Sequence, residues 1–137
     1  MISDELYFLD SYANRSVILY GNQDTNRAWK LLLEDSPISV TREEVRVGKR
    51  NYKGANLGCI FVRPHPESHT ASVAVVAGTG TLGSRLGARL PYFVSGIGYP
   101  DFTVFDDRVF EKGVEGVRAA GYFEADWSLG EDAVYSF

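Results

Sequence analysis

A glycine-rich turn in the middle of the chain carries the most specific chemical signal of the sequence. Gly78-x-Gly80-x-x-Gly83 follows an apolar run and opens a stretch that can form a helix, which is the setting of the dinucleotide-binding fingerprint. Such a turn presents backbone N–H groups to a pyrophosphate at a helix N-terminus. Asp106, 23 residues after Gly83, is the candidate partner for a ribose hydroxyl. The turn residues that would contact a ligand are Thr79, Gly80 and Thr81.

The same turn also has a purely structural interpretation. The predicted helix runs only from Thr81 to Leu90 before Pro91 stops it, and a whole dehydrogenase would need a substrate domain for which no chain remains. Glycines at these positions also suit a tight strand–helix turn with close packing. We prefer the tight turn and keep binding of a nucleotide or another phosphorylated ligand as the alternative.

A second polar segment follows the first predicted strand. Ligands of open α/β sheets bind in crevices outside the C-terminal ends of the strands. If the strands over 16–20 and 71–77 are neighbours, this segment and the Gly78–Gly83 turn share one rim. The structural interpretation is that Asp24 or Thr25 caps a helix while Asn22 and Asn26 tie the turn. The candidate ligand-binding side chains of this segment are Asn22, Asp24, Thr25 and Asn26.

No catalytic constellation is evident in the sequence. Nucleophilic catalysis needs a serine or cysteine activated by a base, but Ser84 has no evident base and the chain lacks a Gly-x-Ser-x-Gly motif. Cys59 lies within a predicted strand and is expected to be inert core. The only two histidines are His65 and His69, and Pro64 and Pro66 on either side of His65 rule out a helical metal pair. We therefore expect no catalytic residue, metal site or cofactor.

The overall composition limits the possible partners. The chain has 137 residues, a mass of 15.2 kDa, a net charge of −4 and a pI near 5.1. This length suits one domain over residues 1–137, and the acidic balance argues against a nucleic-acid partner. The longest apolar runs fall short of 18 residues, so no membrane span is predicted.

Hydrophobic periodicity predicts the elements that must position these residues. Buried strands are expected over 16–20, 58–62, 71–77 and 102–105, and a hairpin with its turn at Gly48-Lys49 is expected at a sheet edge. Helices are expected over 28–33 and 81–90, with a final one from 108 that ends at Gly121 and that Gly113 and Gly116 weaken. The order predicts an α/β fold, a three-layer sandwich with a mostly parallel mixed sheet of Rossmann-like or flavodoxin-like type and an antiparallel edge hairpin.

Several long strings within residues 16–127 resemble a known kind of segment. They are Val-Ile-Leu-Tyr-Gly-Asn-Gln-Asp-Thr-Asn at 17–26, Phe-Val-Arg-Pro at 61–64, Val-Ala-Gly-Thr-Gly at 76–80, Arg-Leu-Pro-Tyr-Phe-Val-Ser-Gly-Ile-Gly-Tyr-Pro-Asp at 89–101 and Gly-Val-Arg-Ala-Ala-Gly-Tyr-Phe-Glu-Ala-Asp-Trp at 116–127. This set resembles the C-terminal α/β domain of large bacterial secreted or periplasmic proteins that carry a prolyl-oligopeptidase or esterase-like α/β-hydrolase domain upstream.

The resemblance implies a non-catalytic accessory domain. Its partner would be the upstream catalytic domain of the same polypeptide, on which it would pack or whose access it would shape. The resemblance also implies a secreted or periplasmic location, with the signal peptide at the N-terminus of the parent and Met1 not a native start. It carries over no catalytic residue and adds no support to the Gly78–Gly83 fingerprint.

Overall fold

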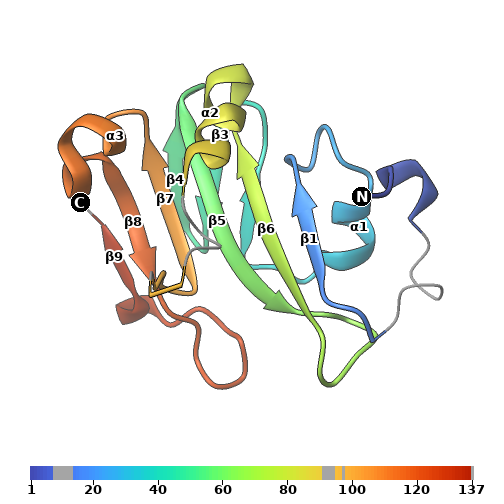
Figure 1. Cartoon of the computed structure of the whole chain (residues 1–137). Coiled ribbons are helices and arrows are strands. Elements are labelled where there is room, and N and C mark those ends of the chain that lie inside the picture. Colours follow the sequence, from blue (N-terminus) through green and yellow to red (C-terminus); the bar gives the residue numbers. More distant parts are fainter. Residues whose placement is uncertain (8–13, 91–94, 97, 137) are drawn as a thin grey trace.

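The computed structural model describes residues 1–7, 14–90, 95–96 and 98–136. Within these residues the strands form two sheets, one of six strands in the order β1-β6-β5-β7-β8-β9 and one of three in the order β2-β3-β4 (Figure 1). The strands are β1 Val17–Tyr20, β2 Ile38–Val40, β3 Glu44–Val47, β4 Arg50–Lys53, β5 Leu57–Pro64, β6 Ser72–Gly78, β7 Phe102–Asp106, β8 Val117–Gly121 and β9 Val134–Ser136. The helices are α1 Ala28–Leu32, α2 Gly80–Leu86 and α3 Val109–Lys112, with 3-10 turns η1 Asp4–Leu6, η3 Gly87–Arg89, η4 Gly113–Gly116 and η5 Glu131–Ala133.

The six-stranded sheet is mixed, as predicted, but the expectation that it is mostly parallel is wrong. Among its strand pairs only β1 and β6 run parallel, while β6-β5, β5-β7, β7-β8 and β8-β9 are antiparallel. The physical reason is the length of the connections. A parallel neighbour requires a crossover of a dozen or more residues, and the link over 65–71 between β5 and β6 is too short for one.

The final helix was predicted too long. α3 ends after four residues at Gly113, whose φ of +60° lies in the left-handed region and breaks the helix. Gly116 then brings the chain against the start of α3, where an added Cβ would lie 2.1 Å from the backbone nitrogen of Val109. Residues 117–121, which were assigned to the helix and its end, form β8 instead and pair with β7.

The predicted hairpin is confirmed, but it is not an edge of the main sheet. β3 and β4 pair around Gly48, which has a φ of +59°, and β2 joins β3 to complete a separate antiparallel sheet. One face of this small sheet is fully buried through Ile38, Val40, Val45 and Val47. It lies across one face of the six-stranded sheet, beside α1 (Figure 1).

The main core therefore lies between two sheets rather than between a sheet and two helical layers. Val73, Val75 and Ala77 of β6 are buried in it, while the alternate residues Ala74 and Val76 are only half-buried. A smaller cluster on the other face holds Ile60, Leu86 and Phe105. The α/β content is confirmed, but the three-layer sandwich is not, because the helices of the described residues are short and few.

Burial of the first strand was also overestimated. β1 is the terminal strand of its sheet, and only Leu19 of its four residues is buried. In the described part of the chain, no helix is both long and apolar enough to cross a membrane.

Candidate functional site

The two polar segments singled out in the sequence do share one rim of the sheet. β1 and β6 are parallel neighbours in the register Tyr20↔Val76, so their C-terminal ends lie at the same edge. The turn after β1 and the glycine-rich turn after β6 are joined directly, because the Asn22 side-chain amide donates a hydrogen bond of 2.9 Å to the Gly78 carbonyl.

Asn22 and Thr25 hold the turn after β1 together. The Asn22 side chain is buried, and its Oδ1 accepts hydrogen bonds from the Asp24 backbone N–H at 3.0 Å and the Thr25 hydroxyl at 3.2 Å. The Thr25 hydroxyl oxygen in turn accepts from the Asn22 backbone N–H at 3.1 Å. The Asn22 Oδ1 and the Thr25 hydroxyl are therefore engaged in the turn itself.

Asp24 and Asn26 tie the turn to its surroundings. The Asp24 carboxylate accepts a hydrogen bond of 3.0 Å from the Arg42 backbone N–H. Asn26, rather than the expected Asp24 or Thr25, supports the start of α1, since its Oδ1 accepts from the Ala28 N–H at 2.9 Å. The reason is spacing, because an oxygen two residues before Ala28 reaches the first free amides of the helix. The preceding N–H, that of Arg27, donates to the Asp4 carboxylate at 2.7 Å.

Three of the backbone amides of the glycine-rich turn are already used within the protein. The N–H groups of Thr79, Gly80 and Gly83 donate to the carbonyl oxygens of Leu57, Arg42 and Ala55 at 2.9, 3.1 and 3.4 Å. A pyrophosphate cradle needs such amides free and aimed at the ligand. Thr79 is fully buried, and its hydroxyl accepts from the Leu57 N–H at 3.0 Å.

The glycines of this turn serve close packing. A Cβ on Gly78 would lie 2.2 Å from the Gly83 carbonyl, and one on Gly83 would lie 2.2 Å from the Leu57 carbonyl oxygen. Gly80 has a φ of +55° and an added Cβ would lie 2.7 Å from the Ala55 carbonyl oxygen. These contacts are those of a tight strand–helix turn, the interpretation preferred from the sequence.

Beside this turn the surface is hollowed into a depression of about 510 Å³, which we call the rim depression. Within the part of the chain that the structure describes, the guanidinium groups of Arg42 and Arg85 make no hydrogen bond or ion pair. Ser84 donates its hydroxyl proton to the Gly80 carbonyl at 2.7 Å. Two unpaired cations beside hydroxyl groups can bind an anion. The depression is lined by Asn22, Thr25, Arg42, Gly80, Thr81, Ser84 and Arg85.

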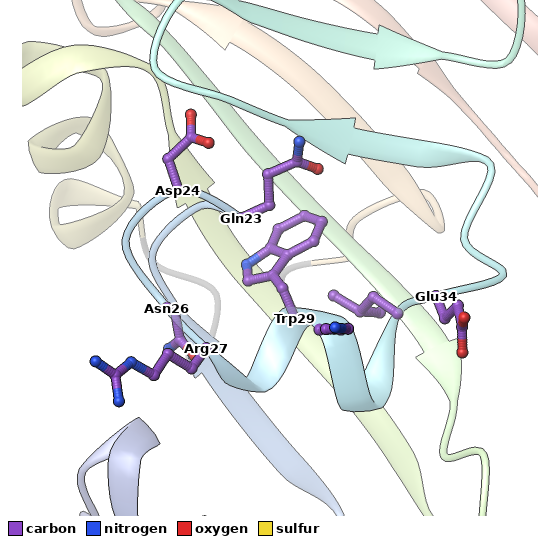
Figure 2. Close-up of a pocket in the computed structure, with 8 residues that line it drawn as sticks. Gln23, Asp24, Asn26, Arg27, Trp29 and Glu34 are labelled. Carbon is purple, nitrogen blue, oxygen red and sulfur yellow. The ribbon is translucent and has the colours of Figure 1, made fainter.

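The predicted ligand-binding residues are thus split among three places. Asn22, Thr25, Gly80 and Thr81 line the rim depression, and Thr79 is buried beneath it. Asp24 and Asn26 instead line a neighbouring groove of about 630 Å³ along α1, together with Gln23, Arg27, Trp29, Lys30, Leu33 and Glu34 (Figure 2).

The groove along α1 offers no aromatic platform for a ligand. Trp29 is buried, its indole N–H donates to the Gly21 carbonyl at 2.8 Å, and its ring packs edge-on against Phe61 with centroids 5.9 Å apart. The indole is therefore a core group that fixes α1 to the sheet.

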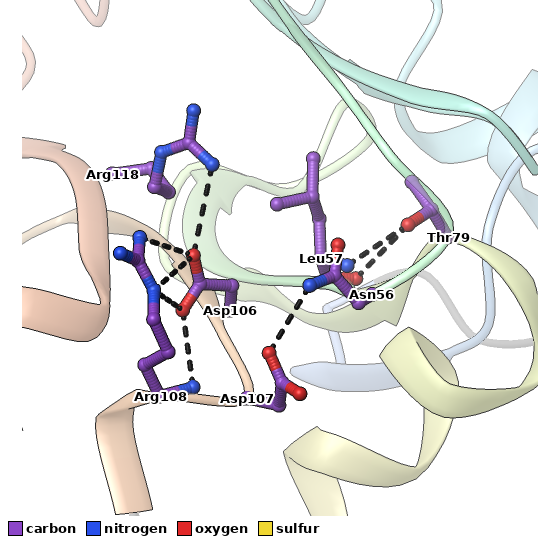
Figure 3. Close-up of polar contacts among 7 residues, drawn as sticks. All are labelled: Asn56, Leu57, Thr79, Asp106, Asp107, Arg108 and Arg118. Carbon is purple, nitrogen blue, oxygen red and sulfur yellow. Dashed lines mark hydrogen bonds and ion pairs between the residues drawn. The ribbon is translucent and has the colours of Figure 1, made fainter. Parts of the chain in front are cut away.

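Asp106 forms a charged cluster that the sequence did not indicate (Figure 3). The buried Asp106 carboxylate accepts hydrogen bonds from Arg108 Nε at 3.0 Å and Arg108 Nη2 at 2.7 Å, and Arg118 Nη1 lies 3.6 Å away. The hydrogen bonds from Arg108 are the main reason why the pKa of Asp106 lies below its ordinary value, although burial opposes them. Because both carboxylate oxygens are occupied, the expectation that Asp106 serves a ribose is not supported.

The cysteine and the histidine that the sequence offers for catalysis have separate structural roles. Burial raises the pKa of the Cys59 thiol far above its ordinary value, which keeps it protonated and inert. His65 is buried, and its Nδ1 accepts from the Glu67 N–H at 3.1 Å while Nε2 lies 3.3 Å from the Tyr7 hydroxyl. A search over the described residues finds no group of His, Cys, Asp or Glu side chains that would hold a metal ion.

Sequence patterns indicate neither of the two arginines of the rim depression. Arg42 belongs to the tight turn between β2 and β3, in the smaller sheet, and reaches the depression through tertiary folding. Arg85 lies on α2, the short helix that follows the glycine-rich turn.

Comparison with known proteins finds a likeness to a secreted fungal protein. The chain is 31% identical over 121 residues to an uncharacterized secreted protein of Arthroderma benhamiae, a match that covers 85% of this chain and 12% of that protein. The chain thus spans about an eighth of the length of this relative. No known family profile matches the sequence, and no solved structure matches the chain.

Proposed function

We propose that this chain is a non-catalytic domain of a larger secreted protein, where it packs on a catalytic domain of the same polypeptide or shapes access to it. The observation that carries the proposal is the uneven coverage of the match, which includes 85% of this chain but only 12% of a secreted relative. A protein of that length has room for several further domains.

The chemistry of the described residues supports a non-catalytic role. A nucleophile must lie within hydrogen-bond reach of its base. The Ser84 hydroxyl donates to backbone carbonyls, the Cys59 thiol is buried, and the buried His65 contacts Tyr7 and a backbone amide. A catalytic domain of prolyl-oligopeptidase or esterase-like type is the neighbour that the sequence resemblance favours. The secreted location belongs to the proposal on the same grounds.

The size of the natural product tests this proposal. An antibody raised against the 137-residue chain is used to blot the culture medium and the cell fractions of the source organism. We expect a band in the medium that is several times larger than 15.2 kDa. A secreted product of about the mass of the chain itself would contradict the proposal.

Hydrolysis assays test the non-catalytic role separately. The isolated chain is expected to hydrolyse p-nitrophenyl esters and peptide amides no faster than buffer does. Turnover by the isolated chain that disappears in a Ser84→Ala variant, but persists in a Ser95→Ala control, would make it a hydrolase in its own right.

A second candidate function is the binding of a nucleotide or another phosphorylated ligand in the rim depression. The observation that favours it is the pair of guanidinium groups, Arg42 and Arg85, which line the depression without a described partner. Because the N–H groups of Thr79, Gly80 and Gly83 are engaged, such a ligand would be held mainly by side chains rather than by a full pyrophosphate cradle.

Calorimetric titration with inorganic phosphate, ATP, NAD and FAD distinguishes the two candidates. The leading proposal predicts no saturable heat at millimolar ligand. The second candidate predicts a saturable response that is lost in Arg42→Gln and Arg85→Gln and kept in an Arg15→Gln control on the exposed surface before β1.

A further inference from the structure

β1 directs a row of backbone groups away from the six-stranded sheet along one of its edges. The Gly21 N–H donates to the Val76 carbonyl at 3.0 Å. With the register of the parallel pair, this bond shows which residues of β1 bond to β6. In a strand, successive residues direct their N–H and C=O groups to opposite sides. Val17 and Leu19 therefore bond to β6, whereas Ile18 and Tyr20 direct their groups away from the sheet.

One of these outward groups already has a partner. The Asn26 side-chain amide donates to the Tyr20 carbonyl at 2.8 Å, which agrees with this direction. Within residues 1–7, 14–90, 95–96 and 98–136, the N–H and C=O of Ile18 and the N–H of Tyr20 are left without a hydrogen bond. Such a row is a template for a further strand.

The opposite edge of the same sheet is protected, which makes the open edge at β1 a specific feature. Arg50 of β4 donates from its guanidinium to the Val134 carbonyl at 3.1 Å and to the Ser136 hydroxyl at 3.0 Å, and so covers β9. Proteins blunt an exposed edge with a very short strand, a charge, a proline or a bulge, or cover it with a helix or loop. β1 is short, with four residues, but these are Val, Ile, Leu and Tyr, so the strand itself carries no charge and no proline.

The surface beside β1 has the shape and chemistry of a slot for an extended peptide. A groove of about 610 Å³, which we call the edge groove, runs between β1 and the N-terminal residues. Its lining includes the apolar Met1, Ile2 and Ala28 and the charged Asp4 and Arg15. Ile18 and Tyr20 are 44% and 49% exposed beside it. Main-chain groups that give affinity, flanked by apolar surface that receives alternate side chains, are the elements of strand addition.

We propose that β1 pairs with an extended segment, apolar at alternate positions, from another part of the larger secreted protein. The inference rests on the proposed function, and the occupant follows from it, because 12% coverage leaves most of such a protein outside this domain. The added strand would satisfy the Ile18 and Tyr20 groups and would bury the exposed side chains of both residues.

Hydrogen exchange measured by mass spectrometry tests the inference. The 137-residue chain and the larger secreted protein are compared at a peptide that includes Ile18 and Tyr20, with the β9 peptide as an internal reference. We expect fast exchange of these two amides in the isolated chain and at least tenfold slower exchange in the larger protein, with β9 unchanged. Equal exchange in both proteins would overturn the inference and leave the proposed function intact.

Other outcomes are equally decisive. A secreted product no larger than the chain overturns both the proposed function and this inference. Protection of Ile18 and Tyr20 in the isolated chain, together with a mass of two chains by light scattering, would assign the edge to a second copy and overturn the proposed occupant.

Substitutions at the edge provide a control for folding. Ile18→Pro removes an N–H that no strand of the isolated domain uses, and Ile18→Val keeps it. In the larger protein, Ile18→Pro is expected to restore fast exchange at Tyr20, while Ile18→Val is not. If Ile18→Pro lowers the melting temperature of the isolated chain, the Tyr20→Lys variant is used instead. Tyr20→Lys puts a charge into the edge groove without changing the β1 backbone. Protection of the edge that survives Tyr20→Lys would contradict the inference.

Discussion

The side chain of Asn22 and the carbonyl of Gly78, 56 residues apart, are joined by a buried hydrogen bond of 2.9 Å. The bond fixes the end of β1 to the end of β6 where the two strands leave the sheet. It brings together the two segments that form most of the rim depression, so the geometry of that depression depends on one amide.

Asn22→Ala is expected to lower the free energy of unfolding by about 1–3 kcal/mol, because it leaves the Gly78 carbonyl without this donor and removes the acceptor for Asp24 and Thr25. Chemical denaturation followed by circular dichroism measures the change. Gln23→Ala is the matched control, because Gln23 is exposed and its backbone N–H, which donates to Val40, is retained. Equal stability of the two variants would show that the Asn22 side chain does not hold the rim.

Gly83→Ala is expected to cost about 1–3 kcal/mol of unfolding free energy or more, because its Cβ would lie 2.2 Å from the Leu57 carbonyl oxygen in the packed backbone. Thermal melting measures the loss. Gly98→Ala serves as the control, since nothing lies within 4 Å of the added Cβ there and the φ is not positive. If Gly83→Ala melted like Gly98→Ala, the close approach of α2 to β5 would not be a feature of the folded protein.

The sequence predicts which segments form the rim of the sheet, but it does not predict the direction of the strands. The apolar runs at β1, β5, β6 and β7 were all assigned correctly, and the expectation that β1 and β6 share a rim is confirmed by their parallel register. Strand direction depends on the length of each connection. The link over 65–71 between β5 and β6 is shorter than the dozen or more residues that a parallel crossover needs. The mostly parallel sheet was wrong for this reason.

Long-range contacts account for what could not be predicted at the site. Arg42 reaches the rim depression from a different sheet, and no local pattern marks it. The spacing of 23 residues from Gly83 makes Asp106 the candidate partner for a ribose, whereas two arginines pair with it in the structure. A pattern of neighbours in sequence does not show that Arg118, on the next strand, will face the same carboxylate.

The Cys59 thiol is expected to be unreactive towards Ellman's reagent in the native protein, because burial keeps it protonated and out of reach. Labelling in native buffer should therefore be orders of magnitude slower than in denaturant at the same reagent concentration, because it requires opening of the fold. In denaturant the same thiol should react at once. Labelling of the native chain as fast as that of the denatured chain would contradict the burial of β5.

The Asp106 cluster is expected to make stability depend on pH in the acidic range. The pKa of Asp106 is lower in the folded chain than in the unfolded one, mainly through the hydrogen bonds from Arg108. The unfolded chain therefore takes up the proton first as the pH falls. The stabilisation is fully present above the unfolded pKa of about 4 and is lost as the pH falls towards the folded value.

Asp106→Asn isolates this contribution, since it keeps the size of the side chain and removes its charge. We expect it to reduce the free energy of unfolding by about 1–3 kcal/mol at pH 7, the range for hydrogen bonds to charged groups. The difference from wild type should shrink below about pH 4, where the wild-type carboxylate is itself being protonated. Asp132→Asn, at an exposed carboxylate, should leave both the stability and its pH profile unchanged. Urea denaturation from pH 7 to pH 3 measures both, and a deficit in Asp106→Asn that stays constant across that range would show that packing around Arg108 and Arg118, rather than the charge of Asp106, stabilises the end of β7.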